Sequence, residues 1–131
     1  MKKTLITAAL LTVLLPIGSD TLARDGSART QKGIASYYHD SLHGRKTASG
    51  QRYSKHRFSA AHRTLPIGTK VQVTDTKTGR SIVVKVNDRG PFARGRIIDL
   101  SREAATELGI VKKGVAKVEL KVLSLPLSHD S

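Results

Sequence analysis

Carboxylates are few in this chain, and three of them stand where a strand is expected to end or a loop to begin. The sequence holds 10 Asp and Glu against 23 Lys and Arg, which gives a formal net charge of +13. Asp88 follows the apolar run Ile82–Val86, Asp99 lies within Ile97–Leu100, and Asp40 lies in a polar loop. A carboxyl group at a strand end can be aimed into a groove, where it can donate and accept a proton.

Each of these carboxylates also has a structural interpretation. Asp88 before Arg-Gly-Pro is typical of a turn, because its side chain can accept hydrogen bonds from nearby backbone N–H groups. Asp99 precedes an expected helix and can cap it or pair with an arginine. Most other acidic residues are expected on solvated faces, in a hairpin or in the tails: Glu103, Glu107, Glu119, Asp75, Asp25 and Asp130. The residues alone therefore leave the role of Asp88 open.

Other residue types narrow the chemistry further. His62 is either a polar groove residue or a hydrogen-bonded core histidine, while His39, His43 and His56 lack metal-ligand spacing, so no metal site is predicted. The sequence has no cysteine, which excludes disulfides, thiolate zinc sites, a cysteine nucleophile and lipid attachment to cysteine. It also has no phosphate-binding loop, nucleophile elbow or dinucleotide fingerprint, so no cofactor is expected.

Three tyrosines and one serine are candidates to line a sugar-binding groove. Tyr37, Tyr38 and Tyr53 can stack against sugar rings, or they can pack in the core or at its rim. Ser49, in Ala48-Ser49-Gly50, is better explained as loop chemistry than as a nucleophile.

The pattern of apolar segments predicts a small β-protein that must hold these side chains in place. Short strands separated by turn residues are expected at Gly33–Tyr38, Phe58–His62, Val71–Thr74, Ile82–Val86, Ile97–Leu100 and Val115–Leu123. Asp75–Gly79 is expected to close a hairpin between the third and fourth of them. Five or six short strands with one short inserted α-helix predict a mainly β fold class, a small closed barrel.

The helix and the last strand carry more detailed expectations. Ser101 is expected to cap a helix that ends at Gly109, with an apolar stripe formed by Ala104, Ala105 and Leu108. In the last strand the side chains of Val118, Leu120 and Val122 are expected to point inward, with a phase slip and a bulge near Ala116.

The two ends of the chain suggest export of one domain. Residues 1–23 have the charged start, the apolar centre and the Thr21-Leu22-Ala23 end of a signal peptide, and the alternative is a retained N-terminal anchor. The polar stretch after Ala23 favours cleavage. The expected order is a signal peptide (1–23), a flexible lead-in (24–32), one barrel domain (33–123) and a loose tail (124–131). We expect a monomer, periplasmic or secreted, without a later membrane span.

The positive charge predicts an anionic partner. Nucleic acid and anionic lipid are the simplest candidates, but the Lys and Arg residues are scattered and an exported protein seldom meets nucleic acid. Anionic polymers of the cell envelope are the favoured partner.

Four segments together resemble the rare lipoprotein A family of septal-ring lytic transglycosylases, which have a double-psi β-barrel. They are Gly33–Tyr38, His43–Gly50, Ala60–Pro66 and Val86–Phe92, and the match continues through Arg96–Ser101, Ala104-Ala105 and Leu108-Gly109. The resemblance covers about Gly33 to Leu123. It implies a six-stranded double-psi β-barrel and endolytic cleavage of peptidoglycan glycan strands, in which the C6 hydroxyl of N-acetylmuramic acid attacks its own anomeric carbon and leaves a 1,6-anhydro end.

The same resemblance implies roles for individual residues. Asp88 matches the catalytic aspartate and His62 matches an assisting groove histidine, whereas Gln51 stands where the family usually has glutamate. The expected substrate-binding residues are Tyr37, Tyr38, Ser49 and Arg89. An amide can hydrogen-bond a sugar but cannot donate a proton as an acid does. Gln51 therefore keeps two hypotheses open, an enzyme that relies on Asp88 or a non-catalytic peptidoglycan-binding barrel.

Two further departures from the family concern the ends of the chain. A lipid anchor on cysteine is excluded, and no room is expected after Ser124 for the glycan-binding domain that many members carry. Recruitment through such a domain is therefore not expected.

Overall fold

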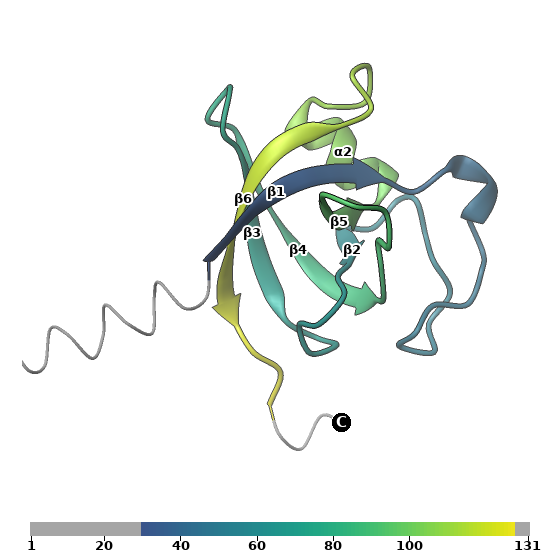
Figure 1. Cartoon of the computed structure of the whole chain (residues 1–131). Coiled ribbons are helices and arrows are strands. Elements are labelled where there is room, and N and C mark those ends of the chain that lie inside the picture. Colours follow the sequence, from purple (N-terminus) through teal and green to yellow (C-terminus); the bar gives the residue numbers. More distant parts are fainter. Residues whose placement is uncertain (1–29, 128–131) are drawn as a thin grey trace, which may run out of the picture. The chain divides into compact units, whose positions relative to one another are not determined.

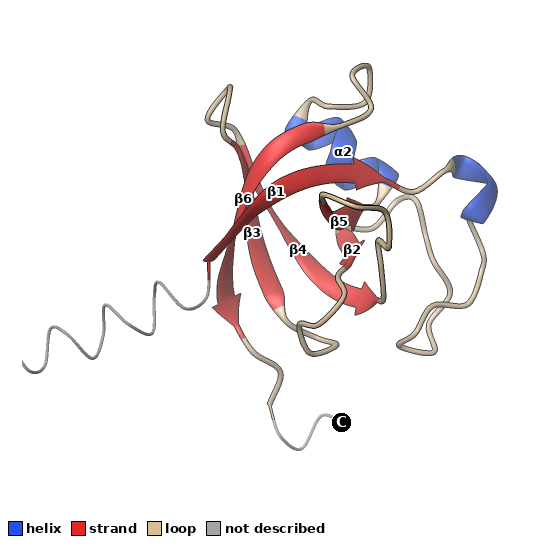
Figure 2. Ribbon diagram, in the orientation of Figure 1, coloured by secondary structure: helices blue, strands red, loops and turns tan. Residues whose placement is uncertain are grey.

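The computed structural model describes residues 30–127, so the expected signal peptide lies outside the described residues. Six strands and two short helices make up this part of the chain (Figures 1 and 2). They are β1 (Thr30–Tyr37), η1 (Asp40–Leu42), β2 (Ser59–Ala61), β3 (Lys70–Asp75), β4 (Ser81–Asp88), β5 (Arg96–Leu100), α2 (Arg102–Leu108) and β6 (Ala116–Ser124). Within residues 30–127, no helix is long and apolar enough to cross a membrane.

The strands close into a barrel in the order β1-β5-β2-β4-β3-β6, which confirms the expected closed barrel (Figure 2). β1 with β5 and β2 with β4 are parallel pairs, whereas β2 with β5, β3 with β4 and β3 with β6 are antiparallel. This mixed, closed six-stranded sheet with one α-helix is the double-psi β-barrel. β2 is only three residues long, yet it lies between β5 and β4 and joins the two halves of the sheet.

Alternating apolar residues fill the barrel. Val71 and Val73 on β3 face Val84 and Ile82 on β4, and all four belong to the buried core. Leu100 on β5 is fully buried, and burial of one such side chain contributes roughly 1.5–3 kcal/mol to folding. The closed core gives the strand ends fixed positions from which functional side chains can project.

The expected hairpin and helix are confirmed. β3 and β4 pair as a hairpin. The carboxylate of Asp75 is 1% exposed and accepts the N–H groups of Lys77 and Thr78. Ser101 accepts the N–H of Ala104 as N-cap, and Gly109 ends α2 with φ 83°, a conformation that favours glycine. Asp75 is therefore committed to the turn.

The expected phase slip near Ala116 is wrong. Ala116, Val118 and Leu120 alternate regularly into the core, while Val115 precedes β6 and is 40% exposed. The irregularity lies at the other end of the strand pair, where the β3–β6 register shifts between Lys70 and Val71.

Candidate functional site

Asp88 ends β4, and its carboxylate is held by three hydrogen-bond donors. Its Oδ1 accepts the backbone N–H groups of Ala48 and Arg89, each at 2.9 Å, and its Oδ2 accepts the hydroxyl of Tyr38 at 2.5 Å. The strand, the 47–51 loop and the end of β1 therefore converge on one half-buried carboxylate. Turn chemistry accounts for the Arg89 contact alone, and the two long-range donors position the group.

Tyr38 is held rigidly by its ring. The ring stacks on Tyr53 with centroids 4.3 Å apart and planes 11° apart, and Tyr53 is itself 2% exposed. Burial, followed by the hydrogen bond to Asp88, raises the pKa of the Tyr38 phenol well above its ordinary value. The hydroxyl therefore remains protonated and available as a donor to Asp88 throughout the physiological pH range.

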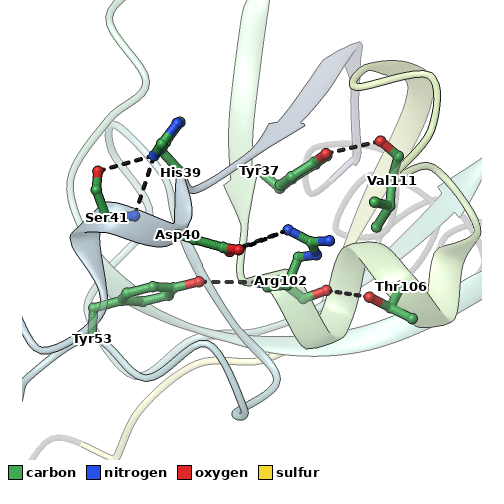
Figure 3. Close-up of polar contacts among 8 residues, drawn as sticks. All are labelled: Tyr37, His39, Asp40, Ser41, Tyr53, Arg102, Thr106 and Val111. Atoms are coloured by element: carbon green, nitrogen blue, oxygen red, sulfur yellow. Dashed lines mark hydrogen bonds and ion pairs between the residues drawn. The ribbon is translucent and has the colours of Figure 1, made fainter.

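Arg102 fastens the loop that follows β1 to the start of α2 (Figure 3). Its guanidinium contacts both carboxylate oxygens of Asp40, at 3.1 and 3.2 Å, and lies over the Tyr37 ring at 5.7 Å. Its backbone N–H donates to the Tyr53 hydroxyl at 3.1 Å, and the Tyr37 hydroxyl donates to the Val111 carbonyl at 2.8 Å. Asp40 is therefore an ion-pair partner in this arrangement rather than a second acid beside Asp88.

Two cavities meet at Asp88. The larger, of about 420 Å³, extends toward the connection between β4 and β5, and the smaller, of about 230 Å³, extends toward Arg45–Thr47. Tyr38, Leu42 and Asp88 line both. A chain-like ligand that occupies both cavities would pass directly over the Asp88 carboxylate.

The 47–51 loop supports Asp88 through its backbone. The N–H of Ser49 donates to the Asn87 carbonyl at 3.1 Å, and the Ser49 hydroxyl lies 2.9 Å from that of Thr47. The carbonyl of Gln51 accepts the N–H of Thr47 at 2.8 Å. Gln51 is exposed, and neither Gln51 nor Ser49 lines the two cavities.

His62 is buried beside the site, with both ring nitrogens engaged. Its Nδ1 accepts the N–H groups of Thr64 and Leu65, both at 3.1 Å, so Nε2 carries the proton and lies 2.9 Å from Gln31 Oε1. Burial, aided by the charges of Arg63 and Arg89, lowers the pKa of His62. Of the two roles weighed for His62, the geometry corresponds to the hydrogen-bonded core histidine.

The environment of His62 predicts that stability falls in mild acid. The unfolded chain takes up a proton near the ordinary histidine pKa of about 6.5, whereas the folded protein takes it up only at a lower pH. Between these two values the unfolded state binds more protons, so stability decreases as the pH falls, by at most about 1.4 kcal/mol per pH unit. We expect urea denaturation at about pH 7 and about pH 5 to show this loss.

The variant His62→Asn keeps an acceptor near the Nδ1 position and cannot titrate. Its free energy of unfolding should fall less over the same interval. Equal losses in the variant and the parent would contradict the assignment of a neutral, buried His62.

The predicted site residues separate into two groups. Asp88, Tyr37, Tyr38 and Arg89 line the larger cavity, whereas His62, Gln51 and Ser49 do not. Arg89 also donates to the carbonyls of His62 and Leu65, at 3.1 and 2.6 Å, and so fixes the turn after β2. Further residues in the wall of the larger cavity, which the sequence interpretation did not propose for binding or catalysis, are Ser36, His39, Leu42, Ala61, Gly90, Pro91, Phe92, Ala93 and Arg96. Asp99, one of the three carboxylates singled out from the sequence, lies in the same wall.

Phe92 carries the clearest signal that the sequence interpretation missed. It is 79% exposed although it is a large apolar side chain, and it follows the Gly-Pro turn directly after Asp88. Its position in the wall of the larger cavity makes the exposed Phe92 ring a candidate for contact with a ligand.

In the described part of the chain, no group of three or more His, Cys, Asp or Glu is arranged to hold a metal ion.

The fold and the groove define a class of protein. A family model described as "Lytic transglycolase" matches residues 30–120. Among solved structures, the Streptomyces papain inhibitor is similar with a TM-score of 0.59 and 27% identity, over 72% of this chain and 94% of that one. An expansin of Clavibacter michiganensis (TM-score 0.58, 24% identity, 76% of this chain and 52% of that one) shares the fold. The described residues are thus a double-psi β-barrel of the lytic transglycolase class.

Within that class, the chain belongs to the RlpA family. It is 54% identical over 92 residues to the "Endolytic peptidoglycan transglycosylase RlpA" of Neisseria meningitidis serogroup B, a match that covers 70% of this chain and 38% of that protein. It is 48% identical over 103 residues to the protein of the same name from Pasteurella multocida, over 79% of this chain and 35% of that protein. The chain spans about a third of the length of these curated relatives.

Proposed function

We propose that this domain is an endolytic peptidoglycan lytic transglycosylase in which Asp88 is both the general acid and the general base. The observation that carries the proposal is the position of the Asp88 carboxylate where two cavities meet. A glycan strand bound in both cavities presents an internal linkage to the acid, as endolytic cleavage requires. The names of the RlpA relatives supply the substrate class.

The reaction needs one acid and no external nucleophile. The protonated Asp88 carboxyl gives its proton to the glycosidic oxygen while the bond to the anomeric carbon of N-acetylmuramic acid breaks. The C6 hydroxyl of the same sugar forms the new bond to that carbon and loses its proton to the Asp88 carboxylate, which restores the acid. Water is not consumed, so the two-carboxylate division of labour found in hydrolases is not required for atom balance.

Other groove residues are suited to holding the glycan. The exposed ring of Phe92 offers an apolar face for a sugar, and Arg89 and Arg96 add positive charge to the same wall. Tyr38 keeps Asp88 oriented while its own hydroxyl stays protonated. Gln51 and His62 support the loop and the turn that surround the acid rather than the reacting atoms.

Digestion of purified sacculi tests the proposal. The protein should release muropeptides with anhydro ends, identified by mass spectrometry, from intact or amidase-treated sacculi. A parallel digest with an RlpA relative serves as the positive control. Absence of anhydro products under conditions where that relative releases them would reject the enzymatic function.

The second candidate is a non-catalytic peptidoglycan-binding barrel, favoured by the amide at Gln51. Co-sedimentation with sacculi should then survive Asp88→Asn, and binding should persist in moderate salt. Purely electrostatic adhesion to the wall is instead expected to weaken steeply as salt rises.

Gln51→Glu separates the two candidates. Because Gln51 is exposed and lies outside both cavities, we expect the new carboxylate to raise the rate of lysis by less than roughly threefold, within what an exposed charge contributes. A gain of roughly a hundredfold, of the size that general acid–base catalysis provides, would instead identify the natural chain as a disarmed enzyme.

We also propose that residues 1–23 direct export and that the exported protein is a monomer without a lipid anchor. The apolar N-terminal run and the absence of cysteine support this. N-terminal sequencing of the exported protein should begin near Arg24, and light scattering should give the mass of one chain. Retention of residues 1–23 would count against cleavage.

A further inference from the structure

A second carboxylate, Asp99, lies level with Asp88 across the narrowest part of the sheet. Ala61 on β2 is the register partner of Asp88 on β4 and also of Asp99 on β5. Because neighbouring strands lie about 4.8 Å apart, the backbones of the two aspartates are roughly 10 Å apart, with only β2 between them. Residues separated in the sequence by the whole β4–β5 connection are thus brought to one level of the barrel.

The residue between the two aspartates leaves their side chains room to face one ligand. Ala61 contributes only a methyl group, and Asp88, Ala61 and Asp99 all line the larger cavity. In glycosidases that use two carboxyl groups, these groups lie roughly 5–9.5 Å apart across the scissile bond. The placement across a single short strand is compatible with that range.

A hydrogen bond from a neighbouring strand orients the Asp99 side chain. The Ser36 hydroxyl donates a hydrogen bond to Asp99 Oδ1, and the two residues are register partners on the parallel strands β1 and β5. Among residues 30–127, no donor is assigned to Asp99 Oδ2. The expected helix-cap and arginine-pair roles are taken by other groups, since Ser101 caps α2 and Arg102 pairs with Asp40.

Tyr38 lies within the electrostatic reach of both carboxylates. After burial and the contact with Asp88, the charge of Asp99 also raises the pKa of the Tyr38 phenol. The negative charge of Asp99 therefore acts on the Tyr38 hydroxyl, which is bound to Asp88. In the proposed function, the glycosidic bond lies beside this pair. Asp75, by comparison, is buried in the hairpin turn and interacts with Lys113 at 3.8 Å.

We propose that Asp99 is the second carboxylate of the sugar site, and that its negative charge stabilises the positive charge that develops on the sugar ring as the glycosidic bond breaks. The inference rests on the proposed function for its reaction, and it assigns a role that the Gln51 side chain cannot fill. Asp88 moves the proton, while the Asp99 carboxylate faces the ring cation and stabilises it. The Ser36 hydroxyl is a positioning group for Asp99.

Steady-state kinetics of lysis by the variant Asp99→Asn test whether the Asp99 charge stabilises the transition state. The amide keeps the size of the side chain but removes its charge, so we expect kcat to fall by roughly a hundredfold with KM within about threefold of the parent, as for an interaction made mainly in the transition state. Ser36→Ala should lower kcat by roughly tenfold. Glu107→Gln, which removes an exposed charge on α2, is the control. A kcat for Asp99→Asn within twofold of the parent, or a change in KM alone, would overturn the proposal.

A binding experiment separates this proposal from the proposed function. The probes are a protonated iminosugar with the shape of N-acetylglucosamine and neutral N-acetylglucosamine itself, measured by calorimetry. Asp99→Asn should weaken the cationic probe by roughly tenfold, as expected for loss of a partly shielded charge pair, and leave the neutral probe within about twofold.

The digest of sacculi and the binding of the two probes test separate claims. If the parent protein releases no anhydro products, the proposed function fails, and the charge-selective loss in Asp99→Asn still decides whether Asp99 faces the sugar. Equal weakening of both probes, or of neither, would refute the role of Asp99. Circular dichroism and thermal melting of each variant confirm that the barrel is folded in every comparison.

Discussion

Asp88→Asn should abolish lysis while the barrel stays folded. The amide retains an oxygen that can accept the N–H groups of Ala48 and Arg89, but it has no acidic proton to give to the glycosidic oxygen. General acid–base groups contribute about a hundredfold to ten-thousandfold in rate, and Asp99, the other carboxyl group in the wall of the larger cavity, is proposed to stabilise charge rather than to move the proton. We expect a loss in that range in the release of anhydro-muropeptides.

Three further measurements make the Asp88 result specific. The melting temperature of Asp88→Asn should stay within a few degrees of the parent, and its co-sedimentation with sacculi should persist. Asp88→Glu, which keeps the acid but displaces it by one methylene, should retain partial activity. Full activity in Asp88→Asn would assign the chemistry to another group and remove the basis of the proposed mechanism.

Tyr38→Phe should also slow lysis strongly. It removes the hydroxyl that donates to Asp88 Oδ2 and keeps the ring that stacks on Tyr53. We expect kcat to fall by roughly tenfold to a hundredfold, somewhat less than the loss of a donor that contacts the transition state directly. KM should change little, because the hydroxyl orients the acid rather than the glycan.

Tyr53→Phe is the matched comparison for Tyr38→Phe. It removes a buried hydroxyl that accepts the N–H of Arg102 but leaves the Tyr38–Asp88 contact in place. An unsatisfied buried N–H costs about 1–3 kcal/mol, so this variant should lose stability more than kcat. The same kinetic defect in both variants would indicate a general disturbance of the loop instead of a specific role for Tyr38.

Much of the barrel follows from local sequence signals. The β3–β4 hairpin has apolar alternation on both sides of a turn with glycine at its end, and α2 has both a serine cap and a glycine stop. The start of β6 could not be placed in the same way, because Val115 continues the apolar run although it precedes the strand and is exposed. Hydropathy alone does not distinguish a loop valine from a strand valine.

The candidate site was only partly predictable, because its geometry is non-local. Asp88 was recognisable from its position at a strand end. The approach of Asp99 depends on β2 pairing in parallel with β4 and antiparallel with β5, which no local pattern encodes. The environment of His62 also depends on a distant segment, because its Nε2 lies 2.9 Å from Oε1 of Gln31 on β1.

The position of β2 between β4 and β5 has a consequence for how the domain can diversify. Asp88 and Asp99 owe their separation to the backbone hydrogen bonds of Ala61's strand, and not to any surface charge. Exposed basic residues that make no contact with the site, such as Lys85 and Lys121, can therefore vary without moving the two acids. In the proposed function, attraction to an anionic wall and cleavage of its glycan are therefore separate properties that can change independently.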